Sequence, residues 1–169
     1  MIEDLIAQNH QLVDTLTYDQ GRIARSVMQT VGETRDQGGP FAQLTGINLR
    51  SVDKGHCIGE LTVRHHHLNP LDIAHGGVAY TLADHICGVA ALTAVSRSAL
   101  VTQDMHLRYH APARLGTLVA EGHVLHKGKR TITVTARITQ NETLVASVTA
   151  TYAILTTREQ RRMKGDSPT

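Results

Sequence analysis

Hydrophobic residues recur at helical spacing through the first part of the chain and at alternating positions through much of the remainder. The helical spacing predicts helix from residue 1 to about 37, with a break near 17–19 and an end at 38–40, where two glycines precede a proline. From Leu44 the period becomes two, and the pattern predicts a pair of strands that turn at 53–56. The chain therefore begins with a helical arm and continues into a sheet.

The longest largely apolar stretch, residues 76–95, is rich in Ala and Leu, and its length favours a buried helix. Strand-like runs follow around 99–109, 118–125, 132–138 and 144–154, and their alternation is typical of antiparallel sheet with one covered face. In the first run we expect one face to carry Val101, Gln103, Met105, Leu107 and Tyr109. The helix is the central element available to cover the sheet, so the pattern predicts an α+β fold.

Three regions follow from these elements. We expect an N-terminal helical arm at residues 1–40, a sheet-and-helix domain at 41–156 and a polar tail at 157–169. The tail mixes cations with Glu159, so we interpret it as a solvated terminus rather than as an anion site.

Composition narrows the class of protein. Aromatic residues make up 3% of the chain and the net charge is +2, which leaves few rings for stacking bases and little attraction for a polyanion. We therefore expect no nucleic-acid partner. Cys57 and Cys87 do not make a disulfide framework, the first residues are acidic where a signal peptide would be basic, and no uncharged apolar run could cross a bilayer. These features predict a cytoplasmic protein that does not associate with membranes.

Asp84 stands in the middle of the apolar stretch 76–95. At about 100° per residue it shares a narrow stripe of the helix with Gly77, Thr81 and Gly88, so small and polar residues leave space beside the carboxylate. A buried carboxylate costs several kcal/mol unless it is paired or useful. Asp84 is therefore a candidate catalytic group, and the alternative is a structural aspartate bonded to Thr81 or to the backbone.

The tripeptide His75-Gly76-Gly77 stands where this helix begins. The first N–H groups of a helix have no partner within it, and two glycines allow a substrate to approach the backbone closely. With the positive end of the helix, these donors could form an oxyanion hole. The alternative is a glycine turn into a helix, just as Asn69 before Pro70 could be only a turn signal.

Asn69, His75-Gly76-Gly77 and Asp84 together resemble the signature of hotdog-fold thioesterases. More narrowly, they resemble the PaaI-type branch of the 4-hydroxybenzoyl-CoA thioesterase superfamily. The segments 102–105 and 109–113 also fit that branch, and the resemblance covers roughly residues 41–156. It implies a hotdog fold, an antiparallel sheet wrapped around one long central helix, here with an N-terminal helical extension.

The resemblance also implies roles for residues. Asp84 would be the nucleophile or the general base, the Gly76 N–H would hold the thioester oxygen, and Asn69 would position the carbonyl or the water. His75 would brace the loop, and Thr102 would assist the water. Hydrolysis of acyl-CoA without a metal or organic cofactor, by dimers that pair into tetramers, comes with the family.

Further polar groups are candidate ligand sites. Arg108 and the basic turn formed by Lys127, Lys129 and Arg130 are candidates for the phosphates of coenzyme A, although such a turn is also simply a soluble hairpin. Gly77, next to the expected oxyanion donor Gly76, is a further candidate for contact with the substrate. The run 65–67 of three histidines, read as strand, lacks a Cys or carboxylate at a recognised metal spacing, so we predict no metal there.

Two other functions compete with hydrolysis. The sequence 69–71 followed by His75 resembles part of the motif of hotdog hydratases, but the helix-borne Asp84 points to hydrolysis. A non-catalytic acyl-CoA sensor with a DNA-binding arm is the second rival. Six acidic residues oppose three basic ones before Gly38, a balance that would repel phosphates.

Helix geometry predicts that two chains share each active site. Gly76 and Asp84 are eight positions apart, which is ~12 Å along a helix axis. A thioester carbonyl needs its oxyanion donor and its attacking group each within ~3 Å. One helix cannot supply both, but two antiparallel helices related by a two-fold axis can. We therefore expect a homodimer in which each Gly76 serves the partner's site.

Overall fold

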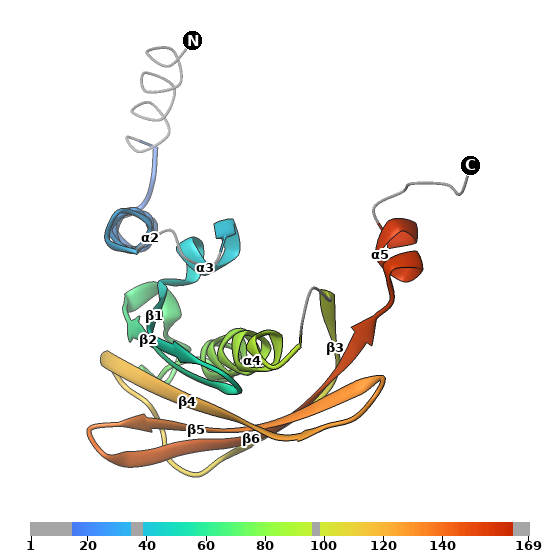
Figure 1. The fold of residues 1–169 in the computed structure, drawn as a ribbon. Coiled ribbons are helices and arrows are strands. Elements are labelled where there is room, and N and C mark those ends of the chain that lie inside the picture. Colours follow the sequence, from blue (N-terminus) through green and yellow to red (C-terminus); the bar gives the residue numbers. More distant parts are fainter. Residues whose placement is uncertain (1–14, 35–38, 96–98, 164–169) are drawn as a thin grey trace.

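In the computed structural model, which describes residues 15–34, 39–95 and 99–163, a curved antiparallel sheet wraps partly around one central helix (Figure 1). The strand order is β1-β2-β4-β5-β6-β3, with β1 and β3 at the edges. Within these ranges, no helix combines the length and apolar character needed to cross a membrane. The elements in chain order are α2 (Tyr18–Glu33), α3 (Gly39–Thr45), β1 (Ile47–Asp53), β2 (His56–Val63), the 3-10 helix η1 (His65–His67), α4 (Gly76–Thr93), β3 (Ala99–Tyr109), β4 (Gly116–Lys127), β5 (Thr131–Gln140), β6 (Thr143–Leu155) and α5 (Thr157–Met163).

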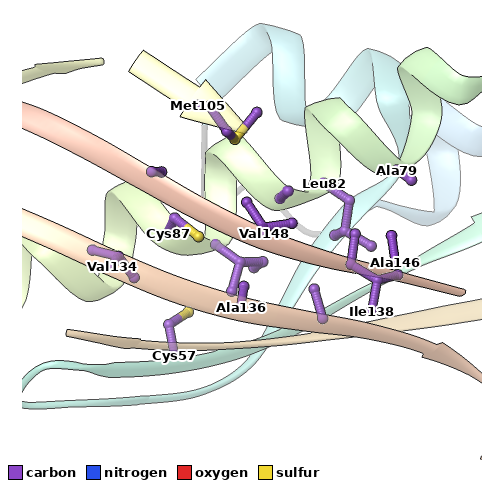
Figure 2. Close-up of a cluster of buried hydrophobic side chains, with 14 of the residues drawn as sticks. Cys57, Ala79, Leu82, Cys87, Met105, Val134, Ala136, Ile138, Ala146 and Val148 are labelled. Atoms are coloured by element: carbon purple, nitrogen blue, oxygen red, sulfur yellow. The ribbon is translucent and has the colours of Figure 1, made fainter. Parts of the chain in front are cut away.

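Helix α4 packs its small and aliphatic side chains into the concave face of the sheet. Its buried residues recur at helical spacing and are Ala79, Leu82, Ala83, Ile86, Cys87, Ala90 and Ala91. Figure 2 shows Leu82 and Cys87 among the inward-facing side chains of β5 and β6. A Cβ built on Gly59 of β2 would lie 2.3 Å from Ile86 Cδ1, so the absence of a side chain there lets the helix approach the strand. The predicted buried helix and its covering role are confirmed.

The opposite face of α4 is not covered by any of the residues that the structure describes. Tyr80 and Leu92, which are large side chains, are 43% and 50% exposed there. Asp84 lies between them along the helix and is half-buried. An apolar helix that is open on one side is an incomplete core, because large exposed apolar patches usually mark an interaction surface.

The N-terminal region contains one more helix than the sequence predicts. Thr17 caps α2 with a reciprocal bond pair to Gln20, which confirms the break near 17–19. We expected helix to end at 38–40, but α3 begins at Gly39, because a proline fits the first turn of a helix, where its missing N–H is not needed. Residues 1–14 and 35–38 of the expected arm lie outside the described residues.

The three histidines at 65–67 form the 3-10 helix η1 rather than the strand that the sequence predicted. Helix α2 packs against it: Ser26 Oγ and His66 Nδ1 lie 2.8 Å apart, and Arg64 pairs with Glu33. The His67 carbonyl accepts from the backbone N–H of His75, just before α4. Helix α2 of the arm thus contacts η1, and η1 in turn contacts the residue that precedes α4.

The alternation of β3 also departs from the prediction. Thr102 is paired with Tyr152, whereas Asp104 is paired with Thr151, so Gln103 forms a bulge. One inserted residue reverses which face the following side chains occupy. Thr102 and Met105 therefore both face α4, and the single face that we expected for Val101, Gln103 and Met105 is wrong. The alternation predicted for β5 and β6 is confirmed by their burial.

Candidate active site

The Asp84 carboxylate is held by two hydroxyl groups from neighbouring strands. Thr102 Oγ1 donates to Asp84 Oδ1 at 2.8 Å from β3. Tyr152 OH, on β6, lies 2.9 Å from the Asp84 carbonyl oxygen and 3.3 Å from Oδ1. Both hydroxyls reach the same carboxylate oxygen, and among the described residues no hydrogen bond reaches Oδ2. This arrangement fixes the carboxylate while leaving one oxygen to act.

The Tyr152 hydroxyl stays protonated and so remains a hydrogen-bond donor to Asp84. It is 2% exposed, and burial, with the nearby Cys87 and Asp84, raises the pKa of its phenol far above the ordinary value. The hydroxyl is therefore protonated at any working pH. The expected stripe of Gly77, Thr81, Asp84 and Gly88 lies on the open side of α4, and the partner of the carboxylate is Thr102 rather than Thr81.

The start of α4 presents a backbone donor. His75 is the N-cap, and its Nδ1 accepts from the Gly77 N–H at 3.0 Å. That bond occupies the Gly77 N–H and leaves the N–H of Gly76 as the candidate donor at the start of the helix. Tyr109 OH donates to the Gly76 carbonyl at 2.6 Å, and a Cβ on Gly76 would lie 2.8 Å from the same hydroxyl. Glycine is thus the residue that this contact admits.

Asn69 organises the loop that leads to the helix. Its Oδ1 accepts from the backbone N–H groups of Leu71 at 2.9 Å and Ile73 at 3.4 Å. Asp72 adopts a positive φ of 55° and donates its N–H to the Asn69 carbonyl. The oxygen of the Asn69 amide is therefore occupied within the loop, and its NH2 group is the part that can contact a substrate.

A cavity of about 390 Å³ opens at this end of the helix. Asn69, His75, Gly76 and Tyr109 form its polar side, and the rest of its wall is largely apolar. Asp84 and Thr102 do not line it. Within one chain, Gly76, the expected oxyanion donor, thus lines the cavity, whereas Asp84, the expected catalytic carboxylate, lies outside it.

The basic candidates lie at the two ends of α4. Arg108 precedes Tyr109 and is therefore near the start of the helix, exposed on the edge strand β3. Lys127 donates from Nζ to the Ala94 carbonyl at 2.7 Å, at the C-terminal end of α4. Arg130 lies 3.6 Å from Glu159 of α5, and Lys129 stands between these two cations in the turn. The turn and Arg108 do not meet within one chain.

The buried cysteines, Cys57 and Cys87, and the three histidines at 65–67 have structural roles. Burial raises the pKa of the Cys87 thiol to about 12, with smaller contributions from Asp84 and Cys57, so it is a core residue and not a nucleophile. The rings of His66 and His67 pack 3.8 Å apart, and His67 Nδ1 accepts from the Arg64 backbone N–H at 3.0 Å.

The sequence did not identify Tyr152 as a site residue. It occupies an inward-facing position of β6 among aliphatic residues, so the pattern indicated only a core residue. A buried phenol usually finds a hydrogen-bond partner, and that expectation could have paired it with the one carboxylate on the apolar helix. Tyr80 was missed in the same way; its hydroxyl donates to the Met105 carbonyl at 3.3 Å and joins α4 to β3.

Comparison with known proteins places the chain in a family. Residues 71–147 match the Thioesterase superfamily. Human acyl-coenzyme A thioesterase 13 is 35% identical over 107 residues, which are 62% of this chain and 74% of that protein.

Two solved structures share the fold. A variant of the phenylacetic acid degradation protein PaaI from Thermus thermophilus superposes with a TM-score of 0.65 at 27% identity, over 69% of this chain and 99% of that chain. The smu.793 protein of Streptococcus mutans UA159, bound to acetyl CoA, gives a TM-score of 0.61 at 32% identity, over 64% and 88%. The predicted fold and family are thereby confirmed, and the chain belongs to the thioesterase superfamily as a hotdog-fold enzyme of the PaaI-type acyl-CoA thioesterase branch.

Proposed function

We propose that this enzyme hydrolyses acyl-CoA thioesters to a free acid and coenzyme A, with Asp84 as the reacting carboxylate. The observation that carries the proposal is the Asp84 carboxylate, which is half-buried on an apolar helix and which, among the described residues, is hydrogen-bonded only through Oδ1. The relatives named for acyl-CoA hydrolysis support the choice of substrate. We also propose that the enzyme acts in the cytoplasm.

Two routes are open to Asp84. As a nucleophile, its Oδ2 attacks the thioester carbon, the C–S bond breaks, the coenzyme A thiolate leaves and takes a proton, and water then hydrolyses the mixed anhydride. As a general base, it removes a proton from the water that attacks the same carbon. In both routes Thr102 and Tyr152 keep Oδ1 fixed, and Oδ2 does the chemistry.

The Gly76 N–H would stabilise the oxyanion that forms on the thioester oxygen. His75 supports this role by holding the next N–H, on Gly77, so that the turn keeps its shape. The Asn69 NH2 group would orient the carbonyl or the water beside it. Donors that are already in place cost little reorganisation in the transition state.

A second copy of the chain would complete the site. Gly76 lines a cavity that lacks Asp84, the open face of α4 carries exposed Tyr80 and Leu92, and Thr102 lies on the edge strand β3. Two chains with antiparallel α4 helices would bring each Gly76 to the partner's Asp84 and would cover the open faces. The shared site requires a dimer, and a dimer of dimers is the further expectation from the resemblance.

Recognition of coenzyme A is the role that we propose for the exposed cations. The basic turn begins beyond the C-terminal end of α4, ~15 Å along the axis from Asp84, a distance suited to an extended pantetheine arm. Arg108, on β3, lies near the N-terminal end of α4 in the same chain. In the antiparallel dimer it would therefore approach the basic turn of the partner. Phosphates would then be held by cations from both chains.

The test is release of free thiol from a panel of acyl-CoA thioesters. Asp84→Asn and Asp84→Ala should each lose ~10²-fold or more in kcat, the usual scale for a lost acid–base or nucleophilic group. Asp104→Asn, on the exposed side of the same strand as Thr102, is the matched control and should keep full activity. Near-normal turnover in folded Asp84→Asn protein would contradict the proposal. Loss of enoyl absorbance without thiol release would favour the hydratase alternative.

A further inference from the structure

Three potential metal ligands meet on the outer face of the sheet, away from the active site. His56 of β2 and His123 of β4 are direct register partners, and their rings stack with centroids 4.2 Å apart and planes 13° apart. Glu121 Oε1 lies 3.0 Å from His56 Nε2 and 3.2 Å from His123 Nε2. One ligand atom from each of the three residues lies within 4.8 Å of the others.

The strands fix this arrangement. Cys57 and Gly122 point into the core, so their neighbours His56, Glu121 and His123 must point outward. The side chains are 25%, 46% and 57% exposed, which leaves them accessible to an ion and free to adjust. Because both strands are hydrogen-bonded to each other along their length, only side-chain torsions need to change on binding.

We propose that His56, Glu121 and His123 bind a divalent transition-metal ion, with Zn²⁺ as the ion of choice. Imidazole nitrogen and carboxylate oxygen are ligands that Zn²⁺ prefers, at ~2.0–2.2 Å in tetrahedral geometry. Glu121 Oε1 lies within hydrogen-bond distance of both Nε2 atoms, so a rotation of the carboxylate would make room for an ion beside the three ligand atoms. Water would supply the fourth ligand.

Asp53 supports this choice from behind His56. Its Oδ2 lies 4.0 Å from His56 Nδ1, the ring nitrogen that faces away from Glu121, so Asp53 must move closer before it can accept a hydrogen bond from that nitrogen. A carboxylate that accepts the second N–H of a metal-binding histidine orients the ring and presents Nε2 to the metal. The cluster thus has three candidate ligands and a group able to orient one of them.

The ion would join segments that are far apart in sequence. His56 and Glu121 are separated by 65 residues, and His56 directly follows the β1–β2 turn. That turn is already tied to the end of α4 through Gly55, whose N–H donates to Thr93 Oγ1 at 2.7 Å. A bound ion would clamp the β1–β2 hairpin to β4, so its effect would be on stability and not on the chemistry at Asp84.

A cluster of hydrogen-bonded charges without metal is the competing explanation. The hydrogen bond from His56, with the charges of both imidazoles, lowers the pKa of the Glu121 carboxyl, which is therefore anionic. Arg137 is the register partner of Glu121 on β5, and its positive charge opposes a cation. The metal site predicts saturable binding that Arg137→Gln strengthens, whereas the charge cluster predicts neither.

The test uses the full-length chain, freed of any affinity tag and stripped of metal with a chelator. Calorimetric titration with Zn²⁺ at neutral pH should show one ion per chain. At a hundredfold excess of free Zn²⁺ over Kd, Tm should rise by about 5–10 °C, as expected for a ligand that binds only the folded state. Thiol release from acyl-CoA should be the same with and without the ion.

Variants locate the site. His123→Asn and Glu121→Gln should each weaken Zn²⁺ binding by about tenfold or more and remove most of the Tm rise. The matched control is His106→Asn, because His106 is an exposed histidine 3.3 Å from a carboxylate, Asp104, without a second histidine opposite. The readout is the Tm change caused by Zn²⁺ within each variant, so altered basal stability does not obscure it. Absence of saturable binding to the unmodified chain, or equal loss in His106→Asn, would overturn the proposal.

Discussion

Tyr152 donates its phenolic hydrogen toward two oxygens of Asp84, the backbone carbonyl at 2.9 Å and Oδ1 at 3.3 Å. The contact joins the inner face of β6 to the middle of α4, and it comes from a ring that is almost completely buried. Thr102 reaches the same Oδ1 from β3. The carboxylate is therefore restrained from two strands, and its orientation depends on the packing of the sheet.

Removal of the Tyr152 hydroxyl should lower turnover without lowering affinity. Tyr152→Phe keeps the ring and its packing but frees Asp84 Oδ1 on one side, so we expect kcat to fall by about tenfold while KM stays unchanged. Tyr80→Phe is the control, since that hydroxyl donates to the Met105 carbonyl and not to Asp84. Combined with Thr102→Val, the loss should exceed the sum of the single losses in free energy, because the two hydroxyls hold one oxygen. An unchanged kcat in Tyr152→Phe would show that Thr102 alone is sufficient.

The cations of the basic turn should divide into two kinds. Lys127 donates to the carbonyl of Ala94, the C-cap residue of α4, and such a contact contributes ~1 kcal/mol or less, so Lys127→Met should lower Tm by about 2–4 °C. Lys129→Gln combined with Arg130→Gln should instead raise KM for acyl-CoA and weaken its dependence on salt. A short acyl thioester without the nucleotide should be affected much less. Equal losses on both substrates would show that the whole turn is structural.

Acid should loosen the contact between α2 and η1. Burial, then the charges of His66 and Arg64, lowers the pKa of His67 from 6.5 to about 4, and burial also lowers that of His66. The unfolded chain therefore binds more protons than the folded chain between these values. Stability is fully present above pH 6.5 and declines as the pH falls toward 4, by up to about 3 kcal/mol for His67.

This loss is measured as the slope of Tm against pH over that interval. His67→Gln, which keeps an acceptor for the Arg64 N–H, should flatten the slope, whereas His106→Asn on exposed β3 should leave it unchanged. A slope in His67→Gln equal to that of the unmodified protein would assign the acid sensitivity to other groups.

The parts of the fold set by periodicity could be predicted, and the parts set by single insertions could not. The apolar run at 76–95 and the alternation in β5 and β6 reflect burial on one face, which any sequence with that pattern must satisfy. The bulge at Gln103 leaves no such trace, because one extra residue changes the facing of side chains without changing their chemistry.

The candidate site divides in the same way. His75, Gly76 and Asp84 lie on one helix, so their spacing could be read directly from the sequence. Tyr152 is 68 residues from Asp84, and the cluster of His56 with Glu121 spans 65 residues, so both contacts depend on strand pairing. The local pattern of hydrophobic and polar residues cannot predict contacts that depend on which strands pair and in which register.

The shared active site that we propose makes a prediction that an active site within one chain does not. Asn69→Asp keeps the Oδ oxygens that fold the loop but removes the NH2 donor at the Gly76 end, and Asp84→Asn removes the carboxylate. In each homodimer every site carries one lesion, whichever arrangement holds. In a heterodimer, shared sites would place both lesions in one site and leave the other intact. Sites within one chain would leave both damaged.

Heterodimers can be isolated by giving the two variants different affinity tags and purifying on each in turn. They should recover about half of the unmodified activity, far above either parent, because one of two sites is rebuilt. Gly76→Ala, whose Cβ would lie 2.8 Å from Tyr109 OH, is a second lesion at the same end and should complement Asp84→Asn equally. Dimers of Asp84→Asn with itself, carrying both tags, should remain inactive. If Asp84→Asn paired with either variant is no more active than the parents, Gly76 does not serve the partner's Asp84, and the thioesterase must draw its oxyanion donor from the chain that carries the carboxylate.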